Sequence, residues 1–149
     1  MTAKKETLTF TNGELVAIGN TLSEFKLKGR ASLGRTWLIK HLEDLNKQFS
    51  ADQLATQKNF FKTDKDGDFV YKKDKKTLIL KDDYTMDEAQ KEFDQLVNEH
   101  ISIEISSYSE RMKALFHALE DYPYELEGQT ALVYALVFDQ FDKAYGKGE

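Results

Sequence analysis

Apolar residues at helical spacing from Leu33 onward predict one long helix, which limits the folds open to this chain more than any other feature. The apolar stripe consists of Leu33, Trp37, Leu38, Leu42, Leu45 and Phe49. Leu54 and Phe61 continue the stripe, whereas Ser50-Ala51-Asp52 offers a point at which the helix can break. Because the stripe runs the length of the helix, the helix must pack on other elements of the chain.

Four segments have the pattern of short β-strands. Thr7–Thr11 alternates and stops at an Asn-Gly turn signal. Ile101–Ile105 alternates strictly with β-branched residues. Phe69–Tyr71 and Thr77–Leu80 predict a hairpin around a charged link. We expect these segments to form a small, mostly antiparallel sheet.

Apolar spacing and local start signals predict four more helices. The first covers Leu15–Phe25, with its apolar residues on one face. Thr85 and Glu88 form a capping box at the start of the second, and Ser109 is positioned to cap the third. The last runs from about Gln129 to Tyr145.

Size and composition predict a single folded domain over residues 1–149. The chain is 40% hydrophobic and contains 10 Phe and 7 Tyr residues, which is typical of a globular protein. No repeat, linker or change in composition divides it. The expected fold class is α+β, with several helices packed on the small sheet; the alternative is a mostly α fold with one hairpin.

A basic segment precedes and opens the long helix. No carboxylate lies between Phe25 and Leu42, and Gly29 is expected to cap the first helix in a left-handed conformation, with Ser32 as the N-cap of the second. A helix N-terminus attracts anions, so the segment is a candidate partner- or anion-binding site. Its residues are Lys26, Lys28, Arg30, Ser32, Arg35 and Lys40.

A structural explanation of the same segment stays open. Gly29 and Gly34 can shape a corner between two helices while the cations stay solvated or pair with acidic residues elsewhere. The acidic candidates are Glu120, Asp121, Glu125 and Glu127.

The run Ala131–Phe138 is apolar all round its expected helix. A helix in a domain of this size usually exposes one polar face, so this one is either central in the core or covered by a second copy of the chain. The candidate oligomer contacts are Leu132, Tyr134, Val137 and Phe138.

Several chemistries find no support in the sequence. The chain has no cysteine, no Gly-x-Ser-x-Gly elbow and no phosphate-binding Gly-rich loop, and Asp64–Asp68 fits no register of a calcium-binding EF-hand. We therefore name no catalytic, cofactor-binding or metal-binding residue. A net charge of -5 argues against a general nucleic-acid binder, although it leaves room for a local basic site. The N-terminus lacks the pattern of a signal peptide, and the longest apolar run is too short for a bilayer, so we expect a soluble protein without a membrane partner.

The order of these features resembles a known family. The resemblance is carried most specifically by Leu27–Arg35 (LKGRASLGR), and more loosely by Ile101–Arg111, in which an alternating Ile strand is followed by a Tyr-Ser-x-Arg helix. It is to a phage and prophage family of Gram-positive bacteria catalogued as a domain of unknown function. The resemblance implies a role in virion assembly or structure, in the host bacterial cytoplasm or the virion, and supplies no catalytic residue.

Taken together, these features predict a non-enzymatic phage or prophage protein that acts by protein–protein contacts, in tail or late virion assembly. Its partner would be another phage protein or a second copy of the chain. The alternative is an anion- or nucleic-acid-binding module that uses the basic segment 26–40.

Overall fold

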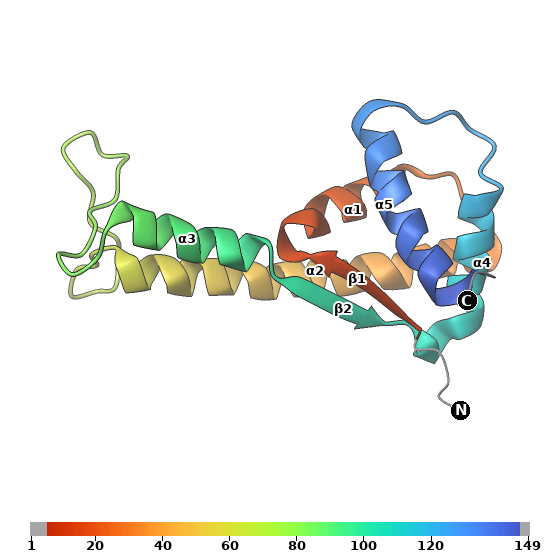
Figure 1. Ribbon diagram of the computed structural model, residues 1–149, viewed down its shortest axis with the longest axis horizontal. Coiled ribbons are helices and arrows are strands. Elements are labelled where there is room, and N and C mark those ends of the chain that lie inside the picture. The colour runs from red at the N-terminus through yellow and green to blue at the C-terminus, as the bar shows by residue number, and fades with distance from the viewer. Residues whose placement is uncertain (1–5, 147–149) are drawn as a thin grey trace. The chain divides into compact units, whose positions relative to one another are not determined.

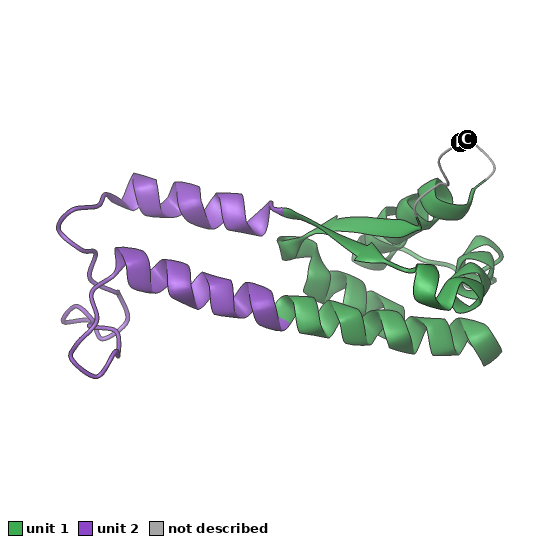
Figure 2. Ribbon diagram, turned by 90° about the horizontal axis from the view of Figure 1, so that it is seen from below, with its two compact units in different colours: residues 1–46, 100–149 green, residues 47–99 purple. Residues whose placement is uncertain are grey.

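The structure, a computed structural model, describes residues 6–146, which contain five α-helices and one small antiparallel sheet (Figure 1). The predicted α+β class is confirmed. The contacts divide the chain into two compact units (Figure 2), unit 1 with residues 1–46 and 100–149 and unit 2 with residues 47–99. This division describes contacts and not independent folding, so the single domain over residues 1–149 remains a prediction.

Unit 1 contains the sheet. Strand β1 (Thr7–Thr11) pairs antiparallel with β2 (His100–Glu104), with Leu8 opposite Ile103. Both strands were predicted, because alternation places every second side chain on the same face. Leu8 is fully buried and Ile103 is 4% exposed, so the apolar side chains of both strands enter the core.

Helices α1 (Leu15–Glu24), α4 (Ser109–Glu120) and α5 (Gly128–Tyr145) complete unit 1 with the first part of α2. Short 3-10 turns precede α1 at Asn12–Glu14 and α4 at Ser106–Tyr108. Helix α5 contacts α1, α4 and β1, and the Gln140 side chain accepts a hydrogen bond from the Thr9 amide at 2.9 Å. The fully buried core side chains include Phe10, Ile18, Leu38, Leu115 and Phe141.

Helix α2 runs without a break from Gly29 to Phe60, so the open question of a break at Ser50 is answered in favour of continuity. Two side chains near that point are bonded along the helix. Gln48 Nε2 donates to Asp52 Oδ1 at 2.8 Å, and Thr56 Oγ1 donates to the Asp52 carbonyl at 2.8 Å. Residues of α2 up to Asn46 belong to unit 1, and those from Lys47 belong to unit 2.

The expected caps around Gly29 are partly wrong. Gly29 has the predicted left-handed backbone (φ +62°), but α1 already ends at Glu24 and Gly29 is the first residue of α2. Ser32 is not an N-cap, because its amide already donates to the Lys28 carbonyl at 3.5 Å and the residue lies inside the helix. The left-handed glycine turns the chain earlier than a serine cap would.

Helix α3 (Met86–Val97) begins at the predicted capping box of unit 2. Glu88 donates its amide to Thr85 Oγ1 at 3.2 Å, and the Glu88 carboxylate accepts from the Thr85 amide at 3.0 Å. A capping box is a local device, which is why the sequence was sufficient to predict it. Ser109 at the start of α4 does not repeat it, because Tyr108 is the N-cap there.

The two segments of the predicted hairpin do pair with each other, but they form bridges and do not join the sheet of β1 and β2 as predicted. Tyr71 and Leu78 do pair antiparallel, but as an isolated bridge, and the other bridges join Phe61 to Leu80 and Thr63 to Phe69. The two segments are thus bonded to each other, with the Ile79 amide donating to the Val70 carbonyl at 3.2 Å, and also to the residues that follow α2. The sheet of β1 and β2 has no third strand among the described residues. Runs of so few residues, separated by charged turns, do not sustain a regular ladder.

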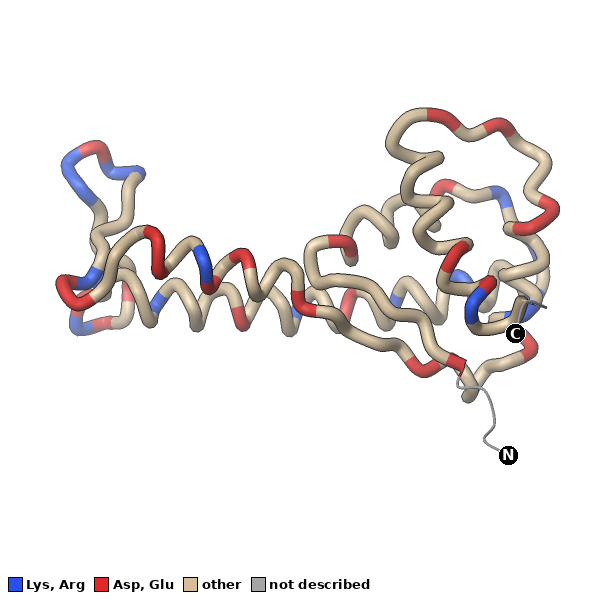
Figure 3. The backbone as a smooth tube through the Cα atoms, viewed as in Figure 1, with Lys and Arg blue, Asp and Glu red and all other residues tan. Residues whose placement is uncertain are grey.

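Two charged turns connect the bridged segments. The turns appear as blue and red stretches of the tube in Figure 3. Asp64 Oδ1 accepts from the amides of Asp66 and Asp68, and Gly67 has φ +85°, which confirms a surface turn at Asp64–Asp68. Within residues 6–146 no group of three or more His, Asp or Glu residues could hold a metal ion. No helix in that range is long and apolar enough to cross a bilayer.

The second turn centres on Asp74, whose titration gives a testable prediction. Hydrogen bonds from the Thr77 hydroxyl and from the Lys76 and Thr77 amides lower the pKa of Asp74 from 3.8 to about 2. A lowered pKa stabilises the folded turn above pH 3.8, and this contribution is lost as the pH falls toward 2. We expect NMR titration of the carboxyl carbon to give a pKa near 2, and Thr77→Ala to move it toward 3.8. Thr77→Ser is the control, since it keeps the hydroxyl; an unshifted pKa in Thr77→Ala would contradict the assignment.

Candidate functional site

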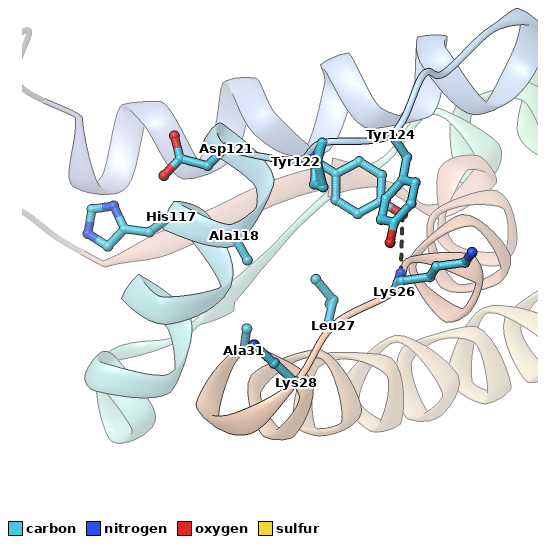
Figure 4. Close-up of a pocket in the computed structure, with 10 residues that line it drawn as sticks. Lys26, Leu27, Lys28, Ala31, His117, Ala118, Asp121, Tyr122 and Tyr124 are labelled. Carbon is cyan, nitrogen blue, oxygen red and sulfur yellow. Dashed lines mark hydrogen bonds between the residues drawn. The ribbon is translucent and has the colours of Figure 1, made fainter.

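An open cleft of about 750 Å³ in unit 1 brings part of the basic segment beside an aromatic loop (Figure 4). Its residues come from the link between α1 and α2, from the first turn of α2, from the end of α4, and from the loop after α4. Lys26, Lys28 and His117 supply nitrogen donors, and Tyr122 and Tyr124 supply aromatic rings. Leu27, Ala31 and Ala118 are apolar parts of the wall, and Asp121 is the one carboxylate in the lining.

The two sides of this cleft are held together by contacts over a long sequence separation. The Lys26 amide donates to the Tyr122 hydroxyl at 3.1 Å, and the Tyr122 ring lies 4.9 Å from the buried Phe25 ring. Tyr124 follows at 5.3 Å from Tyr122, and Lys26 Nζ lies 4.8 Å from its ring centroid. The cleft therefore combines a placed cation with two aromatic faces, of which Tyr124 is 49% exposed.

Arg35 does not face the cleft as a free cation. Its guanidinium donates to the Phe25 carbonyl and, at 3.3 Å, to the Leu22 carbonyl, at the C-terminal end of α1. The Leu22 carbonyl also accepts from the Phe25 amide at 3.3 Å, and a positive charge is favoured at this end of a helix. For Arg35 the structural explanation of the basic segment is therefore the one that the contacts support.

The other residues of the basic segment are dispersed. Arg30 Nη1 lies 3.1 Å from Glu110 Oε2, and both side chains are largely exposed. Glu110 is not among the four acidic residues that were expected to pair with the basic segment. Ser32 Oγ accepts from Arg35 Nη2 at 3.4 Å. Lys40 is exposed further along α2 and does not line the cleft. The structure thus brings only Lys26 and Lys28 together in the cleft.

The four candidate oligomer contacts on α5 also separate. Val137 is 1% exposed and lies in the core of unit 1, which favours burial over an oligomer contact for this residue. The Tyr134 hydroxyl donates to the Leu119 carbonyl, and burial, followed by the charge of Glu120, raises the pKa of Tyr134. Phe138 lies 5.6 Å from the Phe116 ring, which leaves Leu132, 68% exposed, as the residue with most free surface.

A second polar cluster lies where β1 begins. Ser109 Oγ donates to Glu6 Oε1 at 2.6 Å, which lowers the pKa of Glu6. The buried Tyr145 hydroxyl lies beside this pair without a close hydrogen-bond partner among the described residues, and burial, with the Glu6 carboxylate, raises its pKa. The cluster joins the start of β1 to α4 and α5, which is a structural role.

Sequence reasoning missed Tyr122 and Tyr124 as site residues. The signal available was a loop in which two tyrosines flank the only proline, Pro123. Nothing local indicates that this loop meets the link before α2, because the contact joins residues 96 positions apart.

The fold and the cleft define an α+β protein with a basic and aromatic surface site. The chain belongs to the family described as "Protein of unknown function (DUF1617)", whose model matches residues 6–149. None of the curated proteins compared with the chain matches it. No solved structure matches it either.

Proposed function

We propose that this protein is a non-catalytic binding protein whose cleft in unit 1 takes an acidic and apolar segment of a partner protein. The observation that carries the proposal is the lining of the cleft, where two lysines, Lys26 and Lys28, stand against one carboxylate, Asp121, and beside two tyrosine rings and an apolar wall. Lysine ammoniums favour carboxylates, and aromatic rings supply large contact areas at low entropic cost.

The geometry supports a peptide segment over a free small anion. The polar donors line one part of the cleft while Leu27, Ala31 and Ala118 offer contacts to apolar side chains, and the cleft is open to solvent. A site for a small anion would instead converge several donors on one point. The predicted anion site of segment 26–40 is weakened further, because Arg35 is bonded to α1 and Arg30 to Glu110.

The partner is, in this proposal, another protein of a phage or prophage, in tail or late virion assembly, and the place of action is the host cytoplasm or the virion. The support for this narrower statement is the sequence resemblance carried by Leu27–Arg35, which includes the part of the cleft at Leu27, Lys28 and Ala31. A second copy of the chain is the other partner of the same class, with Leu132 as the exposed contact.

Nuclear magnetic resonance on the isotope-labelled full chain tests the cleft. The probe is a short synthetic peptide that alternates glutamate and leucine, compared with the same peptide carrying lysine in place of glutamate. We expect the acidic peptide to shift the amides of Leu27, Lys28, Ala118 and Tyr122, and Lys26→Glu with Lys28→Glu to weaken it about tenfold or more.

The matched control is Lys40→Glu with Lys47→Glu, which makes the same change in net charge outside the cleft. Binding in the control should stay close to that of the unchanged chain. Equal losses in the two double variants, or equal binding of the lysine peptide, would count against the cleft as the site.

A further inference from the structure

Four lysines crowd one turn of unit 2. Lys72, Lys73, Lys75 and Lys76 surround Asp74, and all are exposed. Within residues 6–146 none of the four lysines takes part in an ion pair. In a chain of net charge -5, this turn is a local concentration of positive charge, visible as the blue stretch of the loop between α2 and α3 in Figure 3.

The turn holds a defined conformation. The Asp74 carboxylate accepts bonds from the amides of Lys76 at 2.8 Å and Thr77 at 2.9 Å, and from the Thr77 hydroxyl. The backbone closes it through Lys72, whose amide donates to the Thr77 carbonyl at 2.8 Å and whose carbonyl accepts from Lys75 at 2.9 Å. The one carboxylate in the turn is thus engaged with the turn itself, which leaves the ammonium groups free for an external anion.

The lysines are not explained by the needs of the fold. Lys75 has a left-handed backbone with φ +61°, a conformation in which glycine or asparagine is favoured. Four neighbouring like charges also repel one another, at a cost to the folded turn. Neither the backbone conformation nor the local balance of charge therefore accounts for lysine at these positions.

An exposed aromatic ring stands directly before the lysines. Tyr71 is 50% exposed, although its backbone is bridged to Leu78. A ring beside clustered lysines is the arrangement that binds single-stranded nucleic acid, because phosphates neutralise the lysines while a base stacks on the ring. Unlike the cleft of unit 1, this turn offers no apolar wall to a peptide, because residues 72–76 are all lysine or aspartate and all exposed.

We propose that the turn at residues 71–76 binds single-stranded nucleic acid, with Lys72, Lys73, Lys75 and Lys76 on the phosphates and Tyr71 under a base. The carboxylates Asp64, Asp66 and Asp68 lie in a separate turn of unit 2, so the favourable surface is short. Binding is therefore modest and strongly salt-dependent, which agrees with a net charge that excludes binding over a whole face.

Fluorescence anisotropy of a labelled oligothymidylate tests this on the full chain. With four phosphates neutralised, the slope of log K against log salt should approach about -3, at roughly -0.7 per phosphate for a single strand. Changing all four lysines to Gln should abolish the slope, and Lys73→Gln alone should reduce it by about 0.7. Tyr71→Leu should weaken binding about tenfold, whereas Tyr71→Phe should keep it.

The charge-matched control changes the exposed Lys47, Lys58, Lys91 and Lys113 to Gln and should keep the slope. Equal loss in the two quadruple variants would overturn the proposal, because it would indicate a general effect of charge. Equal affinity for duplex DNA, or no difference between Tyr71→Leu and Tyr71→Phe, would overturn the single-stranded assignment. Binding to phosphatidylserine vesicles without binding to the oligonucleotide would overturn it in favour of a membrane surface.

Discussion

Gly34→Ala is expected to destabilise the protein by about 1–3 kcal/mol, although alanine is the better helix former. A Cβ added at Gly34 in α2 would lie 2.6 Å from the Arg111 carbonyl oxygen and 3.2 Å from Met112 Cε of α4. The first of these atoms is backbone, which cannot move aside as a flexible side chain can. The two helices must therefore separate to admit one methyl group, and the free energy of unfolding, measured in urea on the full chain, should fall.

Gly19→Ala is the matched control, because the same substitution is made inside α1 with nothing within 4 Å of the added Cβ. Here the helix propensity acts alone, and we expect a gain of about 0.5–1 kcal/mol. The two variants should thus move the urea midpoint in opposite directions. Equal stabilisation by both would mean that α2 and α4 do not approach this closely at Gly34.

Arg35→Met is expected to cost about 1.5–3 kcal/mol, since hydrogen bonds to charged groups contribute about that much. Methionine keeps much of the length and apolar stem of the side chain but removes the donors to the Phe25 and Leu22 carbonyls. Those carbonyls are partly buried and would lose their charged partner at the end of α1. Thermal or urea unfolding of the full chain measures the loss.

Arg30→Met is the control within the same basic segment. Its partner Glu110 has 83% of its side chain exposed and Arg30 has 67%, so the pair is solvated and the expected change is within about 0.5 kcal/mol. If the segment instead bound an anion through both arginines, neither variant would be strongly destabilised, and added phosphate would stabilise the unchanged chain. If Arg35→Met and Arg30→Met had similar free energies of unfolding, this would contradict a stabilising role for the bonds from Arg35 to the end of α1.

The sequence was sufficient where the deciding interactions are local. The strand Thr7–Thr11 and the box of Thr85 and Glu88 depend on alternation and on hydrogen bonds across three residues, so each could be predicted from a short window. The hairpin was predicted only in part. Its two segments do pair with each other, at Tyr71 and Leu78, but their further partner, the stretch after α2 at Phe61 and Thr63, was not predicted.

The candidate site shows the same division. The sequence determined that a basic segment opens a long helix and that two tyrosines share a loop with the only proline. Only the tertiary structure decided that Arg35 turns to α1, that Val137 enters the core, and that Lys26 meets Tyr124. The sequence gives the type and charge of each side chain. The direction of a long flexible side chain depends on which hydrogen-bond acceptors or rings from distant parts of the chain lie within its reach. Which of these groups lie within reach depends on how the helices pack. At Gly34 the packing of α2 against α4 leaves less space than one methyl group needs.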